Sequence, residues 1–121
     1  MSIILGSAPT VHFDQTQFES DGAFLVEIVG LFLNTCPELL SALENAVSRK
    51  DAQRLRRTAH SLGGAVSIFG AESVVEQIRM LEIMGKNGNL SGVDEAWRGV
   101  RRLMGELLSE MQAIPNQAIE K

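Results

Sequence analysis

The fold is decided by the stretch Ala59-His60-Ser61-Leu62-Gly63-Gly64-Ala65-Val66-Ser67-Ile68-Phe69-Gly70, which places a histidine and two adjacent glycines inside a helical pattern. Apolar residues recur in and before this stretch at steps of three and four, the period of a helix that packs one face against a core. They are Leu55, Ala59, Leu62, Val66 and Phe69. At about 100° per residue, His60 points away from that stripe. The pattern predicts a helix over residues 51–69, capped by Asp51, with an outward imidazole.

The adjacent glycines, Gly63 and Gly64, lie inside this predicted helix. Each costs roughly 0.5 to 1 kcal/mol relative to alanine in a helix interior. The apolar stripe keeps its phase beyond the two glycines, so they do not end the helix. We interpret them as positions without side chains that let another molecule approach His60 closely. Gly70 is interpreted as the residue that stops the helix. Helical projection places five residues beside His60 on the outward surface: Gln53, Arg56, Arg57, Gly64 and Ser67.

Three further helices are predicted from the same periodicity. The first begins at Asp21, runs as one kinked helix through Pro37 and closes at Ser48-Arg49-Lys50. The next covers residues 71–84 and places Gly85 inward, with Ser73 and Glu76 at capping-box spacing. The last is opened by Ser91 with Asp94 and is followed by Pro115. Short connections and the absence of strand-like alternation predict an all-α fold, an antiparallel up-down four-helix bundle.

The predicted bundle covers residues 14–112 and begins with a short helical turn over residues 14–18. Residues 1–13 show no period and predict a flexible lead-in, with His12 as an ordinary loop histidine. Residues 113–121 predict a frayed tail. At 121 residues the chain is long enough for one domain with its own core.

Composition narrows the possible functions. The single cysteine, Cys36, lies in an apolar periodic stretch and is predicted to be a buried core thiol. No apolar run approaches the roughly 20 residues that span a bilayer, and the N-terminus lacks the basic opening of a signal peptide. We therefore expect a cytoplasmic protein without a membrane partner. A net charge of −4 and no lysine-rich stripe argue against nucleic acid as a partner.

His60, Leu62, Gly64 and Gly70 resemble the motif of histidine-containing phosphotransfer (HPt) domains, roughly H-x-L-K-G with a second glycine six residues later. The resemblance covers about residues 14 to 110. It implies that His60 carries a phosphoryl group between a sensor histidine kinase and the receiver domain of a response regulator. This chain has Gly63 where the family usually has a lysine that favours the phosphoryl charge.

A neutral imidazole is a good nucleophile near neutral pH if one ring nitrogen faces outward and the other carries the proton. Glu82 lies 22 residues after His60, a spacing that returns it to the level of His60 on the next antiparallel helix. In the family, a glutamate or glutamine at the matching position orients the imidazole. Arg79 and Lys86 lie on the side of Glu82, and one of them or Arg56 is a candidate to replace the charge missing at Gly63. The residues expected to face a partner are Arg56, Arg57, Gly63, Gly64, Ser67, Ile68, Arg79 and Lys86.

The sequence has no phosphate-cradling glycine loop with lysine and no kinase signature, so we expect no autonomous kinase activity. As the family implies, the protein binds no cofactor, and Mg²⁺ is held by the partner receiver or kinase. We expect a monomer. Three alternatives stay open: an HPt-like module that docks a receiver or kinase without transferring phosphate, an unrelated bundle that binds a partner helix or oligomerises, and a metal-binding bundle.

Overall fold

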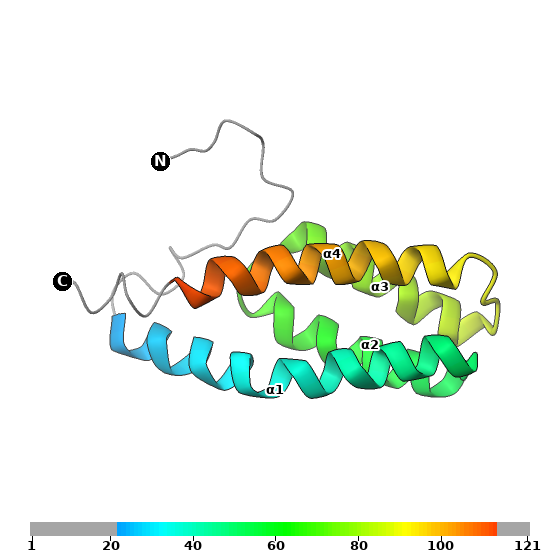
Figure 1. Ribbon diagram of the computed structural model, residues 1–121, viewed down its shortest axis with the longest axis horizontal. Coiled ribbons are helices and arrows are strands. Elements are labelled where there is room, and N and C mark those ends of the chain that lie inside the picture. Colours follow the sequence, from blue (N-terminus) through cyan, green and yellow to red (C-terminus); the bar gives the residue numbers. More distant parts are fainter. Residues whose placement is uncertain (1–21, 114–121) are drawn as a thin grey trace.

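Residues 22–113 are described by the computed structural model (Figure 1), and they form four α-helices with no strand among them. The all-α prediction is confirmed. The predicted turn over residues 14–18, the Asp21 cap, His12, the lead-in and the tail from residue 114 lie outside the described residues.

Helix α1 spans Gly22–Arg49 and continues through Pro37 as a single helix, as predicted. Its C-terminus is closed by the two residues that follow. The amide of Lys50 donates to the carbonyl of Val47 (3.2 Å), and that of Asp51 donates to Ala46 (2.9 Å). Lys50 has a φ of 56°, the left-handed conformation that ends many helices. This tight turn reverses the chain into the next helix.

Over Phe24–Arg49, helix α1 is long and apolar enough to cross a membrane on length and composition alone, with a mean hydropathy of 1.4. The expectation that no stretch approaches this length was therefore wrong. It counted consecutive apolar residues, whereas mean hydropathy tolerates interspersed charges such as Glu27 and Glu38. In the bundle, α1 supplies buried side chains to the core, and 22% of its most apolar window is buried.

Helix α2 spans Ala52–Ser67. The predicted cap is confirmed, because the carboxylate of Asp51 accepts a hydrogen bond from the amide of Arg54 at 3.1 Å. The helix ends two residues before the predicted boundary. The turn that follows contains Gly70 with a φ of 70°, which agrees with its predicted role as a stop.

Helix α3 spans Glu72–Asn87 and ends three residues later than predicted, at the C-cap Gly88, which has a φ of 72°. The Ser73–Glu76 capping box was a wrong prediction, because Ala71 is the N-cap and Ser73 lies inside the helix. Glu72 in the first turn and Lys86 in the last are the charges that the helix dipole favours at those ends.

Helix α4 spans Val93–Gln112. Its N-cap is Gly92 with a φ of 80° and no side-chain hydrogen bond, so the predicted opening by Ser91 with Asp94 was also wrong. Asp94 and Glu95 lie in the first turn, where the dipole favours acidic residues.

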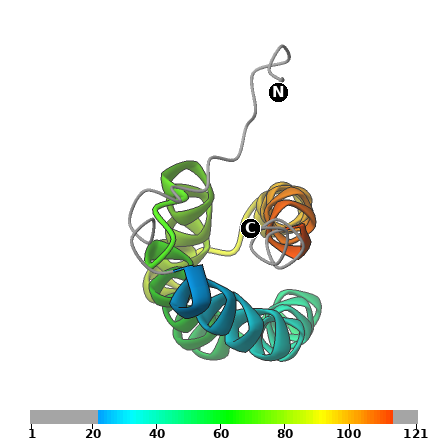
Figure 2. The same cartoon turned by 90° about the vertical axis from the view of Figure 1, so that its left-hand side faces the viewer.

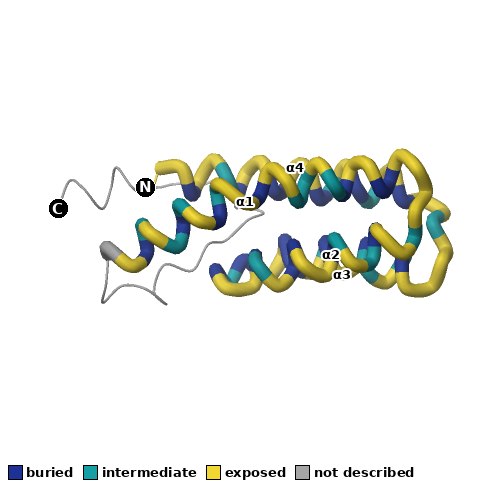
Figure 3. Tube along the Cα trace, turned by 90° about the horizontal axis from the view of Figure 1, so that it is seen from below, coloured by how far each residue is buried: buried dark blue, intermediate teal, exposed yellow. Residues whose placement is uncertain are grey.

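The four helices form a closed antiparallel ring, seen end-on in Figure 2. Each helix contacts the next in sequence, and α1 also contacts α4. The buried positions turn toward the middle of the bundle in Figure 3. The largest fully buried side chains are Phe69, Leu43, Leu55, Leu62, Ile78, Leu81, Met104, Leu107, Met111, Val29 and Val66. This core holds α2 and α3 side by side, and these two helices carry the predicted site.

Candidate functional site

His60 lies on the outer surface of α2. The residues of the predicted apolar stripe are buried against the core, and His60 is on another side of the helix with 75% of its side chain exposed. The ring is therefore accessible to a macromolecule that docks on this face.

Glu82 contacts His60 from the neighbouring helix α3. The distance between His60 Nδ1 and Glu82 Oε2 is 2.8 Å, and the Glu82 side chain is 29% exposed. An ionised carboxylate can only accept a hydrogen bond, so Nδ1 carries the proton and donates. In the neutral ring, Nε2 then keeps its lone pair and is not engaged by Glu82. The structure thus brings together the two residues that the sequence predicted to form a pair.

The surface around His60 has little obstruction. Gly64 is exposed, and a Cβ added there would have no atom within 4 Å beyond its neighbours and its own helix backbone. One turn on, Ser67 is exposed and its hydroxyl donates to the Gly64 carbonyl at 2.8 Å. Ile68 is 49% exposed, and Arg57 is exposed as well. This surface agrees with the clearance expected for Gly64.

Gly63 is not on that surface. It is buried between α2 and α3, and a Cβ at this position would lie 3.4 Å from Ile78 Cγ2. The prediction that Gly63 itself faces a partner was therefore wrong. Gly63 belongs to the helical side that turns toward α3, about 80° from the buried stripe, whereas Gly64 points outward.

Three cations flank the His60–Glu82 pair without being neutralised. Arg79 and Lys86 are exposed on α3, and Arg56 is partly buried on α2. Within residues 22–113, none of them takes part in an ion pair, unlike Lys50, which pairs with Asp94 at 3.4 Å.

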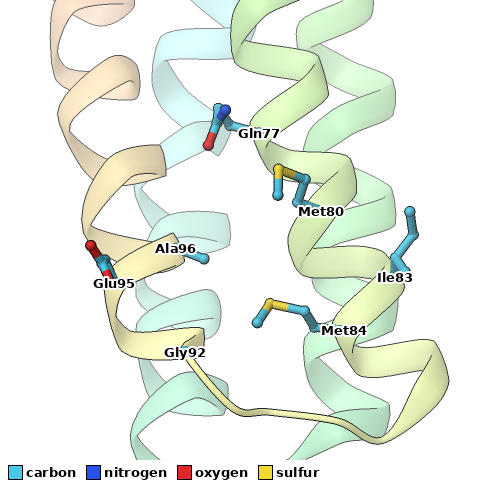
Figure 4. A pocket seen from close by; sticks show the side chains of 7 residues that line it. All are labelled: Gln77, Met80, Ile83, Met84, Gly92, Glu95 and Ala96. Carbon is cyan, nitrogen blue, oxygen red and sulfur yellow. The ribbon is translucent and has the colours of Figure 1, made fainter.

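A groove of about 510 Å³ lies on the other side of α3, between α3 and α4, and does not include His60. Figure 4 shows Met80 and Met84 of α3 facing Ala96 and Gly92 across it. The complete lining is Gln77, Met80, Ile83, Met84, Gly92, Glu95 and Ala96. His60 therefore projects from a helical surface and not from this groove.

Cys36 is buried, as predicted, and burial raises the pKa of its thiol to about 11. This keeps the thiol neutral and suits a packing role. Among residues 22–113, no group of three or more His, Cys, Asp or Glu side chains could hold a metal ion.

Sequence reasoning missed two features of the site. Leu31 on α1 is 67% exposed, and the ring contact between Phe32 and Phe69 (5.1 Å between centroids) puts Leu31 at the level of Ile68. A helical projection of α1 could have found Leu31, because it places this residue off the core stripe.

The second missed feature is the contact of Gly85 with the α2 backbone, although Gly85 faces inward as expected. No local signal in the sequence reveals how closely α2 and α3 approach.

The exposed His60, hydrogen-bonded to a carboxylate from the adjacent helix of a four-helix bundle, is the arrangement expected of a histidine phosphotransfer domain. The sequence model of the Hpt domain family matches residues 27–117, about three quarters of the chain, and the chain belongs to that family.

A solved structure is similar over nearly its whole length: histidine-containing phosphotransfer protein B (HptB) from Pseudomonas aeruginosa PAO1. It is 25% identical with a TM-score of 0.75, and the match covers 95% of this chain and 99% of that one. The comparison with curated proteins found no match. These findings support histidine phosphotransfer in phosphorelays, and HPt proteins generally interact with kinases and response-regulator receivers.

Proposed function

We propose that His60 accepts a phosphoryl group from one phosphorelay partner and donates it to another, between a sensor histidine kinase and the receiver domain of a response regulator. The observation that carries this proposal is the 2.8 Å hydrogen bond from Nδ1 to Glu82 in a ring that is otherwise exposed. With Nδ1 as the donor, Nε2 keeps its lone pair and is the proposed nucleophile.

In the proposed step, the Nε2 lone pair attacks the phosphorus of an aspartyl phosphate on the receiver. The N–P bond forms as the P–O bond to the receiver's aspartate breaks, and the leaving group is the aspartate carboxylate. Nδ1 keeps its proton, and Glu82 stabilises the positive charge that develops on the ring. Transfer to a receiver is the reverse of this step, and proximity in the docked complex supplies most of the acceleration.

The partner is expected to dock over the outward face of α2. Gly64 allows close approach to His60, and Ile68 with Leu31 of α1 offers exposed apolar area at one end of the site. Gly64→Leu would add a side chain in open space, so the fold should persist while docking fails. Binding of Gly64→Leu to a receiver that binds the natural protein, measured by calorimetry, tests this surface, and unchanged affinity would place docking elsewhere.

Magnesium belongs to the partner in this proposal, since receiver and kinase active sites hold it beside the transferring group. Chelation should block transfer in the mixture yet leave label already on His60 intact. Loss of label from isolated phosphorylated protein on chelation would contradict this. We also propose a cytoplasmic location, supported by the free cysteine, and cell fractionation tests it.

The central experiment incubates the protein with a ³²P-labelled phosphorylated receiver. We expect acid-labile, base-stable label on the protein, lost in His60→Gln and retained in His12→Gln, which alters the chain's other histidine. Binding of the receiver without label on any variant would favour the alternative, a docking module that does not transfer phosphate.

A further inference from the structure

The interface between α2 and α3 holds the His60–Glu82 pair between two glycine contacts. These helices make the most extensive contact of any pair in the described bundle. Four residues before Glu82, Ile78 faces Gly63 of α2. Three residues after Glu82, Gly85 faces the backbone of Ala52 and Arg56. The two contacts therefore lie about one helical turn to either side of the hydrogen bond.

The two glycines differ in what they permit. A Cβ at Gly63 would lie 3.4 Å from a side-chain methyl of Ile78, which is close to an ordinary van der Waals distance. A Cβ at Gly85 would lie 2.6 Å from the Ala52 carbonyl oxygen and 2.7 Å from the Arg56 nitrogen. These are backbone atoms inside a helix, so they cannot move independently. Any side chain at position 85 would push the two helices apart by most of an ångström.

We propose that Gly85 is a positioning residue of the phosphoacceptor site: it sets the helix separation at which the Glu82 carboxylate reaches His60 Nδ1. This inference rests on the proposed function of His60. The hydrogen bond is 2.8 Å long, and N–H···O bonds are found up to about 3.2 Å, so a shift of most of an ångström at this level breaks it. Without the carboxylate, neither nitrogen is selected for the proton, and the reactive lone pair no longer points outward in every molecule.

The test compares Gly85→Ala with Gly63→Ala, the same substitution in the same interface. Two measurements are made on each: imidazole ¹⁵N chemical shifts, which report which nitrogen is protonated, and the rate of phosphorylation by a labelled receiver. We expect Gly85→Ala to show mixed tautomers and a rate lower by up to about 100-fold, the cost of a misplacement of about 1 Å. Gly63→Ala should retain both properties of the natural protein. A Gly85→Ala protein with the natural tautomer and rate would overturn the proposal.

A second variant keeps the proposal testable if Gly85→Ala does not fold. Glu82→Asp leaves the Gly85 contact intact but withdraws the carboxylate by one methylene, so it lengthens the same gap from the other direction. It should produce the same mixed tautomers and slow transfer, and natural behaviour would show that the separation is not critical. If the natural protein accepts no label at all, the proposed function fails, while the imidazole spectra still decide whether Gly85 positions Glu82.

Discussion

The two sides of α3 differ in how closely a neighbouring helix approaches. Toward α2, Gly85 brings backbone against backbone, and Glu82 spans the remaining distance to His60. Toward α4, methionines line an open groove, and Met80 is 53% exposed. The contrast shows how residue size divides one helix between two tasks. Between α2 and α3, a glycine without a side chain sets the helix separation that the hydrogen bond of Glu82 requires. Between α3 and α4, long flexible methionine side chains suffice, because they only have to cover apolar area.

The largest expected effect comes from removing the carboxylate on the α2 side. Glu82→Ala should slow phosphorylation of His60 by about 10- to 100-fold, the range found when a metal-ligating histidine loses the carboxylate that orients it. Glu82→Gln should lose less, because the amide oxygen still accepts from Nδ1. Met80→Ala, on the α4 side of the same helix, is the matched control and should transfer at the natural rate. Equal rates in Glu82→Ala and Met80→Ala would remove the functional contrast between the two sides.

The second effect is a change in stability that depends on the space between α3 and α4. A Cβ at Gly99 of α4 would lie 3.8 Å from Gln77 Oε1, an ordinary contact. Gly99→Ala should therefore raise the free energy of unfolding by about 0.5 to 1 kcal/mol through helix propensity, measured by urea denaturation, without altering phosphotransfer. A loss of stability would show that α3 and α4 are packed as tightly as α3 and α2.

A smaller effect is expected from restoring the family's usual lysine. Because the Cβ at position 63 meets only the Ile78 methyl, Gly63→Lys should fold and extend its ammonium toward solvent along the interface. We expect phosphorylation up to about fivefold faster, the scale of an exposed charge interaction, and the gain should vanish at high salt. Gly63→Met, similar in length and uncharged, is the control. A gain of equal size in Gly63→Met would show that charge is not the cause.

The smallest effects belong to the three cations near the pair. We expect at least one of three single variants to transfer phosphate about twofold more slowly: Arg56→Ala, Arg79→Ala or Lys86→Ala. The effect is small because each charge is solvated and screened. Arg98→Ala on the exposed surface of α4 is the control. If all four proteins transfer at the natural rate, no cation substitutes for the lysine absent at position 63.

Much of this fold was predictable because helical periodicity is a local property. The stripe from Leu55 to Phe69 is buried, the carboxylate of Asp51 caps α2, and α1 continues through Pro37. The predictions that failed concern the N-termini of α3 and α4. Ser73 and Ser91 had suitable spacing for caps, but Ala71 and Gly92 occupy the N-cap positions. Helix ends depend on the path of the connecting turn, and spacing alone does not report it.

The amino-acid sequence by itself determined that four amphipathic helices form and that His60 faces outward, since both follow from a repeat of three and four residues. It also determined that Glu82 returns to the level of His60, because 22 residues separate the two across an antiparallel turn. Only the tertiary structure decided that Gly63 is buried, that Gly85 lies against the α2 backbone, and that α3 and α4 leave a groove. Those outcomes depend on the distance between helices. That distance is set jointly by side chains far apart in the chain, so no local pattern encodes it.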